Sequence, residues 1–171
     1  MKRLFLVVLA VVLVGSFAFA DVSAKAGQLG LQSGLIFTGS GNAGAVGAKY
    51  MITDTIGARA GLGLSISSSG GSSTTYFDLG GGVEFHFGGK GGVSPYAGAE
   101  LNYSGEAHST GATAPSEFGM YAMFGGEYFF SSNFSWAGEA RLGFDSRTSS
   151  GSTTTKFGTF GFATFLTWYI N

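Results

Sequence analysis

Glycine is distributed so evenly along this chain that no segment after residue 20 offers room for an ordinary helix. The sequence has 31 glycines in 171 residues, and the longest glycine-free stretch after residue 20 runs from Glu127 to Ala137. That stretch contains Ser131-Ser132-Asn133, a run typical of turns. A glycine inside a helix costs about 1 kcal/mol relative to alanine, and the mean helix has about 11 to 12 residues. Helices are therefore not expected beyond residue 20.

Strict alternation of apolar and polar residues takes the place of helical periodicity. Between Tyr76 and Phe87, one face carries mainly Phe, Leu and Val, and the other carries Tyr, Asp, Glu and His with glycines. Such period-two patterning is typical of strands with two unlike faces. The sequence predicts eight strands, at approximately Gly27 to Thr38, Ala45 to Thr53, Ile56 to Ile66, Tyr76 to Phe87, Pro95 to Tyr103, Glu117 to Phe130, Phe134 to Asp145 and Phe157 to Ile170.

The connections between these strands are predicted to alternate between short and long. Compact turns are expected at residues 53–55, 88–94 and 131–133, and loops rich in Ser, Thr and Gly at residues 39–44, 67–74, 104–116 and 146–155. Strands of about 9 to 11 residues with this alternation are typical of a transmembrane barrel whose short turns face the periplasm. The fold class is therefore all-β, an eight-stranded antiparallel up-and-down transmembrane β-barrel. Its last strand should pair with its first, because an open edge in lipid leaves backbone groups unpaired.

The distribution of charge indicates which face points inward. All charged strand residues share the face with fewer aromatic residues: Lys49, Arg59, Asp78, Glu84, Glu100, Glu127, Glu139, Arg141 and Asp145, together with His86. This many charges do not suit the apolar cavity of a soluble ligand-binding barrel, whereas an eight-stranded barrel is just wide enough to enclose them. The charged face is predicted to be the lumen, because a charge facing the lipid midplane costs roughly 2 to 4 kcal/mol.

The aromatic residues of the opposite face fall near the strand ends, as expected for the two interfacial belts of a membrane barrel. The belt near the short turns is predicted to contain Tyr50, Phe85, Phe87, Tyr128, Phe130, Phe134, Trp136 and Trp168. The belt near the long loops is predicted to contain Phe37, Phe77, Tyr103, Phe118, Phe144 and Phe160.

The first twenty residues have the three parts of a cleaved secretory signal. Lys2 and Arg3 precede an apolar run from Leu4 to Val14, and Ala18-Phe19-Ala20 forms a cleavage site. An uncleaved anchor is the alternative, but the run is shorter than the about 20 apolar residues that span a bilayer. Residues 1–20 are predicted to be the signal peptide and residues 21–171 a single barrel domain.

Composition excludes several classes of function. The chain has no cysteine, so thiol nucleophiles and Cys-ligated metal centres are excluded, and no His cluster supports another metal site. The formal net charge of -1 argues against a nucleic-acid partner. Only 11% of the residues are charged, fewer than the about 25% of ordinary domains. No cofactor and no metal are expected.

These features resemble the small outer-membrane barrel family typified by OmpX and the transmembrane domain of OmpA. The resemblance covers about Gly27 to Asn171 and rests on the signal peptide, the eight alternating segments, the charged lumen and the alternating final run from Phe160 to Ile170. It implies a bacterial outer-membrane location, surrounding outer-membrane lipid, and recognition of the last strand by the barrel-assembly machinery. In the family that strand usually ends in an aromatic residue, whereas this chain ends in Ile170-Asn171.

The most specific candidate site is a charge network in the lumen. Lys49 and Arg59 are equidistant from Asp54, so they should lie opposite each other, and like charges so placed need acidic partners. Glu100 and Glu139 lie at comparable height on later strands. The network is predicted to comprise Lys49, Arg59, Glu84, Glu100, Glu127, Glu139 and Arg141 and to close the lumen, with a gate or narrow ion path as the alternative. Inward glycines would relieve crowding or leave space for water, at positions 30, 34, 47, 61, 63, 80, 82, 98, 119, 125, 143 and 161.

Catalysis has little support in the sequence. His86 lies near the turn end of its strand, and His108 adjoins Ser109 in a predicted loop with no fixed orienting acid. No catalytic residue is assigned, and the protein is predicted to be a monomeric, non-enzymatic structural or surface-exposed barrel. A narrow channel for small solutes or ions is the alternative, and a lipid-modifying enzyme a more distant one. The loop residues Glu106, His108, Glu117, Arg147 and Lys156 are interpreted as a solvated rim rather than a binding site, and a surface ligand of unknown identity stays open.

Overall fold

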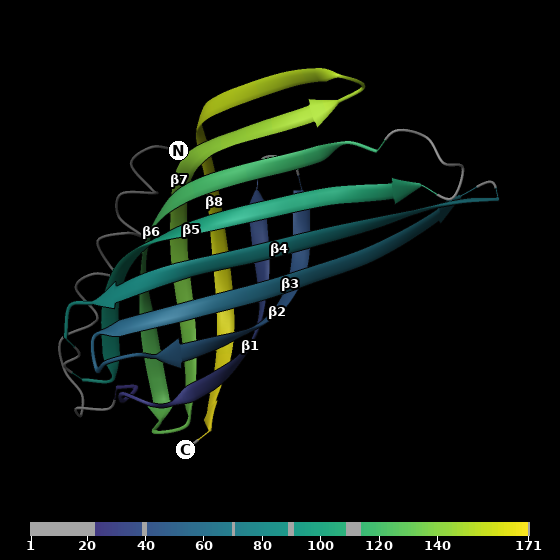
Figure 1. The fold of residues 1–171 in the computed structure, drawn as a ribbon. Helices are drawn as coiled ribbons and strands as arrows, with labels where there is room; N and C mark the ends of the chain where they lie inside the picture. Colours follow the sequence, from purple (N-terminus) through teal and green to yellow (C-terminus); the bar gives the residue numbers. More distant parts are fainter. Residues whose placement is uncertain (1–22, 39–40, 70, 89–90, 109–113, 171) are drawn as a thin grey trace, which may run out of the picture.

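The computed structural model describes residues 23–38, 41–69, 71–88, 91–108 and 114–170, and they form a closed barrel of eight antiparallel strands (Figure 1). The predicted signal peptide, residues 1–20, lies outside the described residues. The strands are β1 Leu29–Thr38, β2 Gly41–Met51, β3 Ile56–Ser69, β4 Ser72–His86, β5 Val93–His108, β6 Ser116–Ser131, β7 Phe134–Ser149 and β8 Ser152–Ile170.

Closure is achieved by the first and last strands. β1 pairs with β8 over nine residue pairs, from Leu29 opposite Ile170 to Phe37 opposite Phe162. Every strand therefore has a hydrogen-bonded neighbour on both sides, as a barrel in lipid requires, although the β2–β3 ladder covers only Val46–Met51 and Gly57–Leu62. The predicted fold class and the pairing of the last strand with the first are confirmed. Among the described residues, no helix is long and apolar enough to cross a membrane.

The predicted long loops are wrong, because most of their residues belong to strands. β3 runs to Ser69 and β4 begins at Ser72, while β7 runs to Ser149 and β8 begins at Ser152. The Ser- and Thr-rich segments pair across these hairpins residue by residue, down to Ser149 opposite Ser152. The remaining two sites follow the same trend: β1 and β2 are separated by residues 39–40, and β5 and β6 by residues 109–115. β-Branched threonine favours extended backbone and pairs well across strands, which explains the extension.

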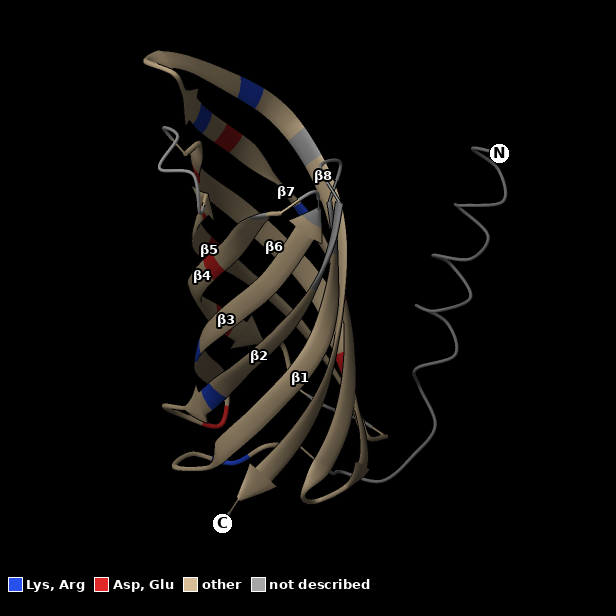
Figure 2. Ribbon diagram, turned by 90° about the vertical axis from the view of Figure 1, so that its right-hand side faces the viewer, with Lys and Arg blue, Asp and Glu red and all other residues tan. Residues whose placement is uncertain are grey.

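Strand length differs strongly around the barrel, so the wall is uneven at one end. β1 has 10 residues and β8 has 19, and the hairpin of β7 and β8 extends furthest past β1 and β2 (Figure 1). This hairpin turns at Ser150 and Gly151, whose φ angles of 49° and 78° suit a tight two-residue turn. Below it, Gly158 has a φ of 76° beside a register shift between β7 and β8, a bulge that bends the hairpin. Several charged residues lie on this extension (Figure 2).

The two ends of the barrel are called here the turn end and the hairpin end. The turn end carries the β2–β3, β4–β5 and β6–β7 turns and Ile170, and the hairpin end carries the other four connections. Residues 23–28 also lie at the turn end, where the Gly27 N–H donates to the Met51 carbonyl. In outer-membrane barrels the longer excursions beyond the membrane are extracellular, so we assign the hairpin end, which carries the strand extensions, to the outer side.

The outward face is apolar and the inward face holds the charges, as the sequence predicts. Large apolar residues such as Leu62, Leu79, Val83, Leu101 and Leu142 are exposed on the outside. Aromatic side chains contact one another at both ends of this surface. Near the turn end these contacts include Phe85 with Phe87 and Phe130 with Tyr128 and Phe134; near the hairpin end they include Phe77 with Tyr103, and Phe144 with Phe118 and Phe157. The side chain of Phe37 lies outside what the structure describes.

Most of the inward glycines make room for side chains of neighbouring strands rather than for water. A Cβ on Gly125 would lie 2.7 Å from the Tyr96 hydroxyl, and one on Gly98 would lie 2.8 Å from the Met123 methyl group. Likewise a Cβ on Gly30 would lie 2.6 Å from the Thr167 methyl group. In a barrel this narrow, a glycine beside a large inward residue relieves crowding.

Candidate functional site

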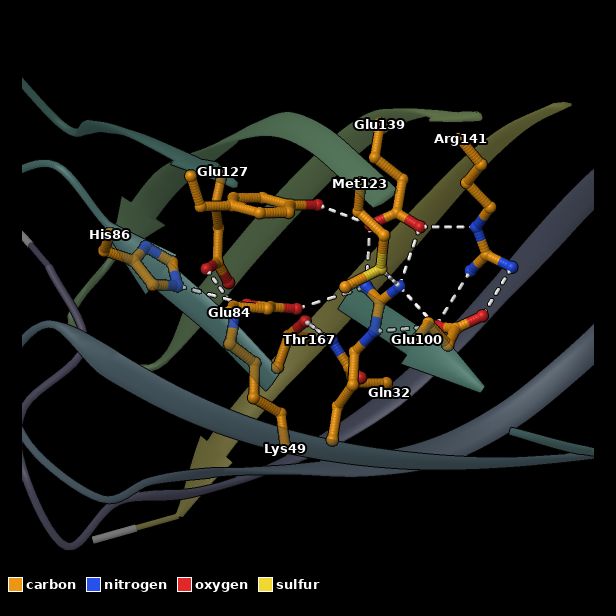
Figure 3. A network of polar contacts seen from close by, with 12 residues as sticks. Gln32, Lys49, Glu84, His86, Glu100, Met123, Glu127, Glu139, Arg141 and Thr167 are labelled. Carbon is orange, nitrogen blue, oxygen red and sulfur yellow. Dashed lines mark hydrogen bonds and ion pairs between the residues drawn. The ribbon is translucent and has the colours of Figure 1, made fainter. Parts of the chain in front are cut away.

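The structure brings the seven charged residues of the predicted lumen network together inside the barrel (Figure 3). They come from the six consecutive strands β2 to β7, and their exposed fractions range from 0% for Glu127 to 7% for Arg59. We call this set the ion-pair plug: Lys49, Arg59, Glu84, Glu100, Glu127, Glu139 and Arg141.

Arg59 is the centre of the plug because its guanidinium group meets three carboxylates. Its Nη1 lies 3.1 Å from Glu84 Oε1 and 2.7 Å from Glu139 Oε2, and its Nε donates to Glu100 Oε2 at 3.0 Å. The Nη2 group donates to Glu139 Oε1 at 2.8 Å, so the contact with Glu139 is bidentate. Such fork-to-fork pairing is the strongest arrangement that arginine and a carboxylate form.

Lys49 organises the part of the plug nearer the turn end. Its Nζ lies 2.6 Å from Glu84 Oε2 and 2.8 Å from Glu127 Oε2. The other oxygen of Glu127 accepts hydrogen bonds from the Ser135 hydroxyl at 2.5 Å and the Tyr169 hydroxyl at 2.8 Å. Both oxygens of this fully buried carboxylate are thus satisfied, as burial of a charge requires.

Arg141 closes the network on the side nearer the hairpin end. Its Nη1 lies 2.8 Å from Glu100 Oε1, and its Nε lies 2.7 Å from Glu139 Oε1. Glu100 and Glu139 therefore each bridge Arg59 and Arg141. Tyr96 donates to Glu139 Oε2 at 2.8 Å and completes the shell of this carboxylate.

The strands without a plug residue, β1 and β8, fill the remaining cross-section. Gln32 on β1 donates to the Thr167 hydroxyl on β8 at 3.2 Å. The Phe165 ring on β8 lies 5.2 Å from the Arg59 guanidinium carbon and 5.9 Å from that of Arg141, a favourable cation–π distance for both. All eight strands thus contribute to one layer that crosses the lumen.

Sequence reasoning missed the uncharged members of this layer. Aromatic residues were expected outside, yet five are buried inside: Tyr96, Tyr121, Phe129, Phe165 and Tyr169. The sequence does contain a signal for them: each lies an even number of residues from an inward charge or glycine on the same strand, as Tyr96 does from Glu100, and therefore shares its face. The hydroxyl of a buried tyrosine needs a polar partner, and a charged lumen supplies it.

The other predicted inward charges lie outside the plug. Asp145 is buried towards the hairpin end, where the Tyr121 hydroxyl donates to it, and Asp78 is partly buried on β4. His86 is buried beside the plug at the turn end. Its Nε2 lies 3.1 Å from Glu84 Oε2, and its Nδ1 lies 2.8 Å from the Ser94 hydroxyl.

The five predicted rim residues lie on strand extensions rather than in loops. His108 ends β5, and the prediction that it lies in a loop is wrong: its Nδ1 lies 3.0 Å from the Thr74 hydroxyl on β4. Glu106 lies 3.3 Å from Arg147 and 3.5 Å from His108. Arg147 is opposite Glu117 in the β6–β7 register, and Lys156 is exposed on β8.

The plug holds three basic and four acidic side chains, all of them buried. Charges in such surroundings are stable only when each is paired and hydrogen-bonded, and removal of one partner leaves the others uncompensated. The arrangement suits a rigid closure. Among the described residues, no group of three or more His, Cys, Asp or Glu side chains could hold a metal ion.

Comparison with known proteins places the chain by its fold. No protein-family model matches the sequence, and no curated protein matches it either. Among solved structures, the outer membrane protein OprG from Pseudomonas aeruginosa has a TM-score of 0.58 and 11% identity over 88% of this chain and 100% of that chain. The chain has the fold of an integral outer-membrane barrel.

Two further solved structures share this fold. A structure described as de novo design of transmembrane beta-barrels has a TM-score of 0.51 and 16% identity, covering 87% of this chain and 100% of that chain. Neisserial surface protein A (NspA) has a TM-score of 0.50 and 16% identity, covering 82% of this chain and 94% of that chain. At these identities the likeness concerns the path of the chain and not the residues of the plug.

Proposed function

We propose that this protein is a monomeric, non-enzymatic barrel of the bacterial outer membrane whose lumen is sealed by the ion-pair plug. The observation that carries the proposal is the saturation of the plug: Glu84, Glu100 and Glu139 each contact two cationic side chains. Its role is structural or surface-exposed, with outer-membrane lipid around it and the barrel-assembly machinery acting on β8 during biogenesis.

A conducting path would require the plug to break. Arg59 would have to leave three buried carboxylates, and each of them would keep only one of its two cationic partners. Such a loss costs about 3 to 5 kcal/mol for a single buried pair. Phe165 adds an apolar wall against both guanidinium groups, which disfavours an aqueous path at this level.

Conductance of the purified, refolded protein in planar lipid bilayers tests the seal. We expect no stable unitary conductance in 1 M KCl at neutral pH. Large, persistent open channels would overturn the proposal and favour the narrow-channel alternative. The Arg59→Ala and Glu139→Ala double variant serves as the positive control, because it removes the bidentate pair at the centre of the layer.

A hydrolytic function has one observation in its favour, the line of Ser94, His86 and Glu84. These residue types form nucleophile, base and orienting acid in many hydrolases. Here the Ser94 residue is only 3% exposed and His86 only 4%, and Glu84 is already paired with Lys49 and Arg59. We therefore interpret the line as an extension of the plug.

Labelling with a fluorophosphonate probe distinguishes these readings, since the probe reacts with activated serines. We expect no labelling of the refolded wild-type protein. Labelling that disappears in Ser94→Ala, but persists in the control Ser135→Ala, would establish an enzyme and contradict the non-enzymatic role.

A further inference from the structure

A cavity lies against the plug on the side of the hairpin end. It is a small pocket that is partly open to solvent. Arg59, Glu100 and Arg141 of the plug border it, and Phe165 forms one apolar wall. Its other polar borders are Gln32, Asp78 and Asn102.

The cavity lies beside a row of three glycines, of which Gly61 has the most open space. Gly47 is the direct cross-strand partner of Gly61, and Gly61 is that of Gly80. A Cβ on Gly61 would meet only the Val46 carbonyl, at 3.7 Å. This differs from Gly125, where Tyr96 occupies the equivalent space. Three adjacent strands thus present bare backbone to the lumen at one level.

The polar groups beside this row have acceptor capacity to spare. Asn102 Oδ1 is buried and has no hydrogen-bond partner among the described residues. It overhangs Gly80, whose added Cβ would lie 2.7 Å from Oδ1 and 3.9 Å from the Glu100 carboxyl carbon. A buried acceptor without a partner costs about 1 to 3 kcal/mol, so a donor at this point is favoured.

Asp78 adds a negative charge on the same side. It lies two residues from Gly80 on the inward face of β4, and within the described part of the chain no cation is within 4.0 Å of its carboxylate. The cations that line the cavity, Arg59 and Arg141, are already held by Glu100 and Glu139. The group that these borders best accommodate is therefore a cationic donor.

We propose that this cavity binds a small organic cation through a primary ammonium group. The ammonium group donates to Asn102 Oδ1 and to the carboxylates of Asp78 and Glu100, and a short aliphatic chain packs against Phe165 and Ile36. The ligand enters from the hairpin end and stops at the plug. This inference does not depend on whether the plug conducts, and it goes beyond a structural role.

Titration of the refolded, ¹⁵N-labelled protein in detergent micelles with propylammonium chloride tests the proposal, at constant ionic strength. We expect saturable shifts of the Gly47, Gly61 and Gly80 amide signals and of the Asn102 side-chain amide. Two probes serve as controls: 1-propanol has the size without the charge, and tetramethylammonium has the charge without N–H donors. Neither should produce these saturable shifts. Shifts of equal affinity with either control, or no saturable shift with propylammonium, would overturn the proposal.

A matched pair of variants separates a local site from the general negative charge of the lumen. Asp78→Asn should weaken propylammonium binding by about tenfold or more, the value of one charge-assisted hydrogen bond. Asp145→Asn removes a different carboxylate of the lumen near the hairpin end, one that accepts a hydrogen bond from the Tyr121 hydroxyl. This variant should leave the affinity for propylammonium unchanged. Equal weakening by both variants would show non-specific attraction and contradict the site. Heat-shifted migration on a gel verifies beforehand that both variants are folded.

Discussion

Lys49 and Arg59 are direct cross-strand partners in the β2–β3 ladder, yet a single carboxylate, that of Glu84, accepts both. Glu84 Oε2 lies 2.6 Å from Lys49 Nζ, and its Oε1 lies 3.1 Å from Arg59 Nη1. Like charges directly opposite each other on one face of a sheet repel. The plug resolves this repulsion with an acid between the two head groups, and each cation then takes further carboxylates of its own.

Loss of Arg59 should therefore destabilise the barrel more than loss of any rim charge. Arg59→Met keeps most of the side-chain volume but leaves three carboxylates facing one another, and we expect a loss of about 3 to 5 kcal/mol in unfolding free energy. The control Arg147→Met removes a half-exposed cation with one ion pair at 3.3 Å, and should cost about 1 kcal/mol or less. Urea unfolding in lipid vesicles, followed by tryptophan fluorescence, measures both. Similar losses for the two variants would contradict the central role of Arg59.

Adjacent glycines on β6 should respond oppositely to the same substitution. Gly125 faces the lumen, where an added Cβ would lie 2.7 Å from the Gly138 carbonyl oxygen and from the Tyr96 hydroxyl. Gly125→Ala should cost about 1 to 3 kcal/mol through overpacking. Gly126 faces lipid, and an added Cβ would meet only Val93 at 4.0 Å, so Gly126→Ala should be neutral or slightly stabilising. If the two variants unfold at the same urea concentration, the conclusion that Tyr96 fills the space beside Gly125 is wrong.

The fold could be predicted from the sequence because lipid penalises polar groups so strongly. Charged residues such as Arg59 and Glu84 must share the inward face of their strands, and this alone orients the wall. The hairpin extensions could not be predicted in the same way. Thr154 and its partner Arg147 lie beyond the apolar belts, where water meets both faces of the sheet. The alternation of apolar and polar residues, which was the signal for strands, therefore disappears there although the strands continue.

The candidate site could be predicted as a set of residues but not as a set of contacts. Parity places Lys49 and Glu127 in the lumen, yet they come from strands that are not neighbours, so their 2.8 Å contact depends on the tilt and register of the whole barrel. The inward tyrosines were missed because aromatic abundance was attributed to the lipid face. Tyr96 and Tyr169 are selected by a polar lumen for their hydroxyl groups.

Variants of two tyrosines on opposite faces of the wall distinguish the contribution of the plug to stability from that of the aromatic belt. Tyr169→Phe keeps the ring stacked on Phe129 but leaves one oxygen of buried Glu127 with fewer donors, and should cost about 1 to 3 kcal/mol. Tyr128→Phe changes a lipid-facing ring at the turn end and should stay within about 1 kcal/mol of wild type. Equilibrium unfolding of both variants in one lipid composition tests the difference. A neutral Tyr169→Phe would mean that Glu127 needs no hydroxyl donor.

The two aromatic belts indicate where the membrane lies along the strands. This position can be tested by introducing an arginine at two depths on the outer surface. Ala122 lies on the outward face of β6 between Phe118 and Tyr128, so Ala122→Arg should cost about 2 to 4 kcal/mol in a bilayer. Thr154→Arg places the same charge on the exposed extension of β8, beyond the belt, and should change the unfolding free energy by about 1 kcal/mol or less. Unfolding in vesicles gives both values. Because arginine loses its hydration only where lipid covers it, an equal effect at the two sites would move the bilayer away from Ala122 and require a different boundary on the wall.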